Sequence, residues 1–188
     1  MKMNIIGKTL FGLVLVIGGR ELYGTDMRAV SIDVNLIIDG SSALTRVRDD
    51  ISSWISGNLV DQRLREGDRL TIWKAGKEAE IVYSDTLKSE ADKENIKKVL
   101  KNFSAAGDAA DFSGALRDAV SRSTGRGIIY TLLVTASPAA LSPTLQGPNA
   151  GLIRFSRIEE TRGWQALVVA LNIDSRVRQA ASAYFLGS

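Results

Sequence analysis

The spacing of apolar and polar residues predicts a strand and then a helix in the early part of the chain. Residues 30–38 begin with strict alternation and end as a continuous apolar run, which is typical of a strand entering a buried sheet. Asp33 and Asn35 interrupt this run, which indicates that the beginning of the strand is exposed on one face. A turn cluster over 39–42 follows, and apolar residues then recur every three or four positions over 44–55, which predicts a helix.

The rest of the chain continues to alternate between strand and helix patterns. Two short apolar runs, 70–75 and 80–83, stand on either side of a turn, and this spacing predicts a β-hairpin. Two further stretches, 88–103 and 112–123, have the spacing of helices, and the β-branched run 128–134 predicts a central strand. Beyond it we expect a long loop over 136–151, a helix through Ile158, a buried strand over 166–171 and a short terminal helix over 175–188.

This order of elements predicts an α/β fold with a doubly wound, mostly parallel sheet and helices on both faces, in the Rossmann-like manner. The hairpin is expected to add one antiparallel edge strand. Ligands of such sheets bind beyond the carboxyl ends of the strands. The loops of interest are therefore 39–43, 106–111 and 136–151, and the last of these holds all three prolines of the chain.

The first residues, 1–24, differ from the rest and are expected to direct export, leaving the folded domain in residues 28–188. Two lysines precede the apolar run 9–19, and a short basic start followed by about 7–15 apolar residues is typical of a secretory signal. The run is shorter than the roughly 18 residues of a full membrane span. No A-x-A-like cleavage site lies between Gly18 and Thr25, so a cleaved signal and an uncleaved anchor both remain open. Either case predicts a periplasmic or other extracytoplasmic domain, anchored to the inner membrane if the segment is retained.

The composition limits the chemistry that the chain can perform. The 188 residues include no cysteine and no histidine, so neither a thiolate nucleophile nor a Ser-His-Asp triad can form. Any metal would have to be held by oxygen ligands, which favours Mg²⁺, Ca²⁺ or Mn²⁺. Lys and Arg outnumber Asp and Glu by only 24 to 21 and are interspersed with them, so a nucleic-acid partner is not expected.

Several strings in the expected order resemble a von Willebrand factor A-type (vWA) domain over about residues 30–188. The apolar strand that ends in Asp39-Gly40-Ser41-Ser42 resembles the first strand and loop of that family. The resemblance implies a doubly wound fold that binds partners at its strand-end loops. Further similar strings are Gly67-Asp68-Arg69-Leu70, Ala79-Glu80-Ile81-Val82, Gly114-Ala115-Leu116 and Leu132-Leu133-Val134-Thr135.

In that family the strand-end loops commonly build a metal-ion-dependent adhesion site that an acidic group of the partner completes. The family pattern is D-x-S-x-S in the first loop, a threonine in the second and an aspartate in the third. Here Asp39 and Ser41 match the first two positions, but Ala43, Ala110 and Ala136 stand at the other three. Mg²⁺ gives up its hydration shell reluctantly. The resemblance therefore implies a degenerate site and partner binding without a metal cofactor.

Two alternatives to this interpretation remain open. A rebuilt Mg²⁺ site would use Asp39, Ser41 and Asp111, with Asp108 or Ser137 as further substitutes for the missing ligands. A metal-dependent phosphohydrolase would use Asp39 as its nucleophile and would need Asp108 or Asp111 as a second carboxylate.

Simpler structural roles also account for some of these residues. Asp39 and Ser41 are residue types that commonly cap a helix, and the predicted helix begins a few positions later. Trp54, Trp73 and Trp164 are expected to pack in the core.

Taken together, these patterns predict a non-enzymatic, exported domain that binds another protein in an envelope or surface assembly. Contact with the membrane is expected only through the N-terminal segment, if that segment is not cleaved. The candidate partner-binding residues are Asp39, Ser41, Ser42, Asp108, Asp111, Ser137 and Pro138.

Overall fold

The protein is described by a computed structural model over residues 30–122, 128–141 and 153–171. The N-terminal segment, most of the proline-containing loop and the helix predicted over 175–188 lie outside these residues. The boundary predicted between export segment and domain therefore stays a prediction. Within the described residues, no helix has both the length and the apolar character needed to cross a bilayer.

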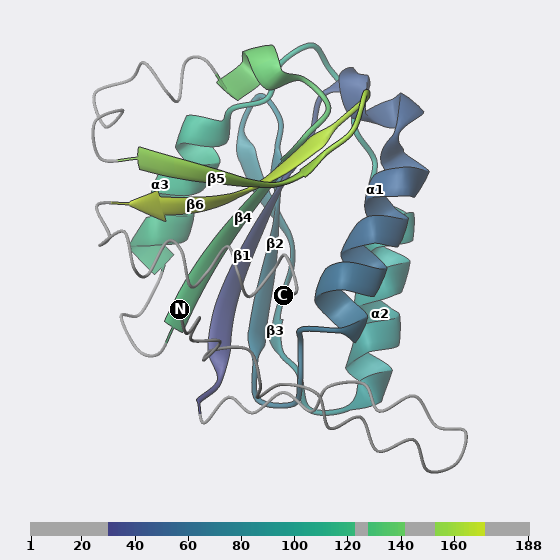
Figure 1. The fold of residues 1–188 in the computed structure, drawn as a ribbon, viewed down its shortest axis with the longest axis vertical. Coiled ribbons are helices and arrows are strands. Elements are labelled where there is room, and N and C mark those ends of the chain that lie inside the picture. Colours follow the sequence, from purple (N-terminus) through teal and green to yellow (C-terminus); the bar gives the residue numbers. More distant parts are fainter. Residues whose placement is uncertain (1–29, 123–127, 142–152, 172–188) are drawn as a thin grey trace, which may run out of the picture.

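Six strands in the described residues form one sheet, in the order β3-β2-β1-β4-β6-β5 (Figure 1). β1 pairs in parallel with both β2 and β4, whereas β3 is antiparallel to β2. β6 is antiparallel to both β4 and β5, so four strands run one way and β3 and β6 run the other. The strands are β1 Ile32–Asp39, β2 Arg69–Ala75, β3 Ala79–Thr86, β4 Ile128–Thr135, β5 Ile153–Glu160 and β6 Gln165–Leu171.

Helices lie on both faces of this sheet, which confirms the doubly wound α/β class predicted from the sequence. α1 and α2 lie side by side on one face, and α3 lies on the other (Figure 1). The helices are α1 Arg48–Ile55, α2 Glu90–Lys101 and α3 Phe112–Arg122, with short turns η1 Ser42–Arg46, η2 Ser56–Asp61 and η3 Pro138–Leu141.

The central strand β1 contributes to a hydrophobic core on each side of the sheet. Ile32, Val34, Leu36 and Ile38 face the side of α1 and α2, whereas Ile37 faces α3. Successive side chains of a strand point to opposite faces, so a strand buried on both faces reads as a continuous apolar run. The apolar run at the end of the first strand thus reflects burial under helices on both sides.

The helix predicted through Ile158 is wrong, because this segment forms strand β5. A tight turn joins β5 to β6, and the side chain of Thr161 accepts hydrogen bonds from the backbone N–H groups of Gly163 and Trp164, at 3.2 and 3.1 Å. So short a connection can join only antiparallel strands, since a parallel pair requires a long crossover. β6 is consequently a second antiparallel strand, in addition to the edge strand β3 that the hairpin pattern predicted.

Candidate functional site

Asp39 lies at the carboxyl end of β1, where it connects the central strand to its neighbour β4. The residue is 0% exposed, and its Oδ1 atom accepts a hydrogen bond from the backbone N–H of Ser41 at 2.8 Å. Its Oδ2 atom lies 2.9 Å from the hydroxyl oxygen of Thr135 and accepts a bond from the backbone N–H of Ala136 at 3.2 Å. Both carboxylate oxygens are therefore engaged inside the protein, where unpaired charge would be costly.

Ser41 occupies the position before the helical turn η1, but its side chain does not cap that turn. No side-chain capping bond forms there, and Leu44 N–H donates instead to the backbone carbonyl of Ser41 at 3.1 Å. The Oγ atom of Ser41 is buried and has no hydrogen-bond partner in the part of the chain described. The capping role considered for Asp39 and Ser41 is therefore wrong, because Asp39 bonds to the turn that precedes η1 rather than to η1 itself.

The loop between α2 and α3 is bound to the β1 loop by backbone hydrogen bonds. Ser42 N–H donates to the carbonyl of Gly107 at 2.8 Å, and Ala106 N–H donates to the carbonyl of Gly40 at 2.8 Å. Gly107 has a φ of 90°, a conformation that residues with a side chain adopt rarely. Two of the three loops expected to form the site thus lie together, as the rule for strand ends predicts.

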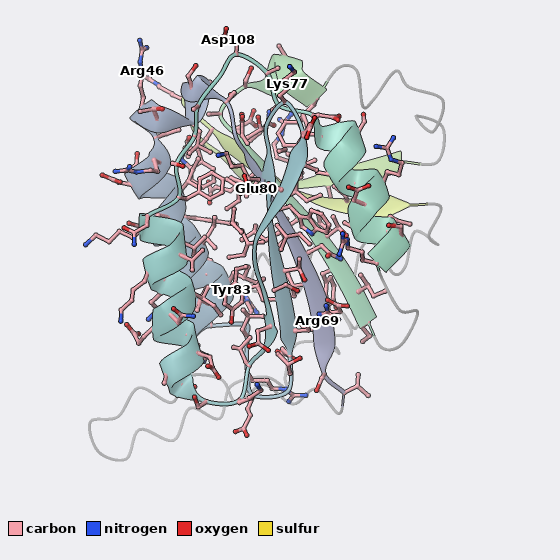
Figure 2. All side chains as sticks on the ribbon, turned by 180° about the vertical axis from the view of Figure 1, so that it is seen from behind. Arg46, Arg69, Lys77, Glu80, Tyr83 and Asp108 are labelled. Atoms are coloured by element: carbon pink, nitrogen blue, oxygen red, sulfur yellow. The ribbon has the colours of Figure 1, made fainter. Side chains whose placement is uncertain are left out.

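Asp111 and Asp108 have different positions in this second loop. The Oδ1 atom of Asp111 accepts a hydrogen bond from Gly114 N–H at 2.8 Å, which is a capping bond at the start of α3. Asp108 is exposed, and Figure 2 shows it at the outer end of the loop. Among the described residues, no group of three or more acidic side chains has an arrangement that could hold a metal ion.

The third loop begins with a local network around Thr135, a residue that the sequence interpretation missed. Thr135 is 0% exposed, and its hydroxyl accepts a hydrogen bond from the backbone N–H of Ser137 at 2.9 Å. Ser137 is half-buried, and Pro138 begins η3. The sequence did hold a signal for this residue, because Thr135 ends an apolar strand and directly precedes Ala136, where the family pattern places a metal ligand.

Comparisons with known proteins show similarity of fold at low sequence identity. No protein-family model matches the sequence, and no curated protein matches it. A solved structure described as von Willebrand factor type A from Catenulispora acidiphila has 16% identity and a TM-score of 0.39, covering 47% of this chain and 22% of the other. Proximal thread matrix protein 1 from the mussel byssus, with a zinc-occupied MIDAS motif, has 15% identity and a TM-score of 0.43, covering 53% and 26%.

A third similar structure, the PilB minor pilin from Streptococcus sanguinis, has 13% identity and a TM-score of 0.40, covering 82% of this chain and 45% of the pilin. This chain therefore spans about a quarter or less of the first two proteins. The order of the strands and the helices on both faces define the class of protein as a doubly wound α/β domain.

Proposed function

We propose that this domain is a non-enzymatic module that binds another protein through its strand-end rim and does so without a divalent cation. The strand-end rim comprises residues 40–43, 106–111 and 136–137, which follow the carboxyl ends of the parallel strands or lie against them. The observation that carries the proposal is the engagement of both Asp39 carboxylate oxygens by groups of β1, β4 and their loops. The carboxylate of Asp39 thus holds the ends of β1 and β4 and their loops together.

The remaining donors of the rim do not suit a hard cation. Mg²⁺ requires about six oxygen ligands in near-octahedral geometry and retains water readily. The hydroxyl of Ser41 is buried without a partner, but Ala43, Ala110 and Ala136 supply no side-chain oxygen. Asp111, the third carboxylate considered, caps α3 with one of its oxygens. The residues present therefore do not fit a divalent metal.

The same geometry disfavours the phosphohydrolase alternative. A nucleophilic carboxylate needs an oxygen that can reach the substrate. Asp39 is fully buried, and each of its oxygens already accepts a hydrogen bond. A rim with exposed small and polar residues, among them Ser42, Ala43 and Asp108, suits contact with a protein surface better than catalysis.

The basic and apolar N-terminal segment supports a location outside the cytoplasm. We place the partner accordingly in an envelope or surface assembly.

The test is capture of partners from native membranes with the full chain as bait, followed by mass spectrometry. We expect a partner that is retained equally with Mg²⁺ and with a chelator, and that is lost when Ser42 and Asp108 are both changed to Arg. The matched control is Glu66→Arg, an exposed site in the loop before β2, at the opposite end of the sheet. Loss of the partner on chelation, or retention by the double variant, would contradict the proposal.

The alternative is a rebuilt metal site, which the unpartnered Ser41 hydroxyl favours. Calorimetric titration with Mg²⁺ or Mn²⁺ distinguishes it from binding without a metal. We expect no heat of binding at submillimolar concentration. Submillimolar affinity that disappears in Ser41→Ala and in Asp39→Ala would establish the metal-dependent alternative.

A further inference from the structure

The α3 face of the sheet changes from apolar to polar part-way along the strands. The paired rows of β1 and β2 on this face are Ile37 with Trp73, Asn35 with Thr71, and Asp33 with Arg69. α3 packs on the apolar row, and the lower ends of β1 and β4 extend past this helix (Figure 1). Figure 2 shows Arg69 on this uncovered part of the sheet.

Exposure to solvent accounts for the outer polar row, where Arg69 is exposed and Asp33 is half-buried, but not for the row of Asn35 and Thr71. The expectation that the start of the strand is exposed on one face is therefore wrong for Asn35. Asn35 and Thr71 are each only 5% exposed, although both are polar and stand in the middle of a sheet. Burial also raises the pKa of Asp33 above its ordinary value, and the nearby Arg69 opposes this shift only in part. Burying polar groups costs free energy unless they find partners.

These side chains line a cavity of about 290 Å³ in the α3 face, together with Ser84 and Arg122. Arg122, the last residue of α3, lies with its guanidinium carbon 5.6 Å from the centre of the Trp73 ring. This cation–π contact holds a positive charge beside the cavity without neutralising it.

Several polar groups of the cavity lack partners in the described part of the chain. The carboxylate of Asp33 makes neither a hydrogen bond nor an ion pair there, and the side-chain amide nitrogen of Asn35 donates to no described group. Arg69 has only a long contact with the hydroxyl of Ser84, at 3.4 Å. The cavity thus combines one free acceptor with several free donors.

From this arrangement we propose that the cavity binds a free dicarboxylic amino acid, of which glutamate and aspartate are the simplest. The two guanidinium groups, Arg69 and Arg122, and the single carboxylate of Asp33 are complementary to a ligand with two carboxylates and one ammonium group. The ammonium group pairs with Asp33, and the carboxylates pair with the arginines and with the amide of Asn35. A cavity of 290 Å³ is large enough for a molecule of this size. This site is separate from the strand-end rim and does not depend on its proposed function.

The test is a titration of the full chain with L-glutamate and L-aspartate, followed by NMR of side-chain amide groups. We expect at least one of them to shift the side-chain NH₂ resonances of Asn35, with affinity that falls at least tenfold in Arg122→Ala and in Asp33→Asn. The matched control is Arg117→Ala, an exposed arginine of α3 that does not line the cavity, and it should bind as the unmodified chain does.

Glutarate, which is glutamate without its ammonium group, tests the role of Asp33. It should bind at least tenfold more weakly than glutamate to the unmodified chain, and this difference should vanish in Asp33→Asn. No shift of Asn35 with either amino acid at millimolar concentration overturns the proposal. Equal binding of glutarate and glutamate, or undiminished binding by Arg122→Ala, overturns it as well.

Discussion

At the scale of single residues, the hydroxyl of Thr135 is a hydrogen-bond partner of the buried Asp39 side chain. It lies 2.9 Å from Asp39 Oδ2 in a region from which water is excluded. We expect Thr135→Val, which keeps the shape and the β-branching, to lower the free energy of unfolding by about 1–3 kcal/mol, because the carboxylate loses a buried partner. Urea denaturation measures the change. Thr131→Val on the same strand is the control, since this half-buried threonine makes no such bond, and an equal loss in both variants would refute the explanation.

The stability of the folded protein is expected to fall as the pH rises, because of Asp33. Burial raises its pKa in the folded protein, so ionisation of this carboxyl group is less favourable in the folded state than in the unfolded state. At about pH 3 the group is protonated in both states, and no penalty arises. As the pH rises through the folded pKa, the penalty develops and the folded state loses stability.

We therefore expect Asp33→Asn to have the same melting temperature as the unmodified chain at about pH 3 and a higher one at about pH 7. Thermal denaturation across this range measures the difference. A variant that is less stable at neutral pH would show that the carboxylate has a stabilising partner.

At the scale of elements, Gly40 permits the close approach of the loop after β1 to the end of β2. Its N–H donates to the carbonyl of Ala75 at 2.7 Å, and a Cβ atom at Gly40 would lie 2.7 Å from that same oxygen. Gly40→Ala should therefore destabilise the fold by about 1–3 kcal/mol, because the backbone has to move apart.

Gly57→Ala provides the matched comparison, since a Cβ atom there meets nothing within 4 Å and the residue lies in the helical turn η2. This change should raise the free energy of unfolding by up to about 1 kcal/mol. Chemical denaturation measures the free energy of unfolding of both variants. A neutral result for Gly40→Ala would indicate that the strand-end loops are less tightly packed than their geometry implies.

At the scale of the whole molecule, two tryptophans connect the β5–β6 hairpin to α1. The rings of Trp54 and Trp164 meet edge to face with centres 5.5 Å apart, and the indole N–H of Trp54 donates to the Glu159 carboxylate at 3.1 Å. These contacts support the antiparallel end of the sheet against a helix that is remote in sequence. The expectation that Trp54 and Trp164 serve packing is therefore confirmed, with the polar end of Trp54 performing a second role.

We expect Trp54→Phe to loosen this hairpin, because an aromatic ring is kept but the N–H that bonds to Glu159 and part of the indole contact with Trp164 are lost. We expect the local free energy of opening to fall by about 1–2 kcal/mol, which corresponds to roughly tenfold faster amide hydrogen exchange in β5 and β6. Exchange measured by mass spectrometry in α2 should stay unchanged. The control is Glu160→Gln, a change at the exposed neighbour of Glu159. Equally faster exchange in both variants would contradict the role assigned to the indole of Trp54.

The sequence alone determined which segments form β1, β4 and the β2–β3 hairpin, because buried strands show as apolar runs and the turn between two short runs marks the hairpin. It also determined that the ends of β1 and β4 meet at one rim, since parallel neighbours in such a sheet end together. Only the tertiary structure decided that 153–160 is a strand and that β6 runs antiparallel, because strand direction depends on pairing across the sheet and not on local pattern. It alone joined Asp39 to Thr135, 96 residues away, and brought Asp33 and Arg122 to one cavity, because contacts between distant residues are selected by the packing of whole elements.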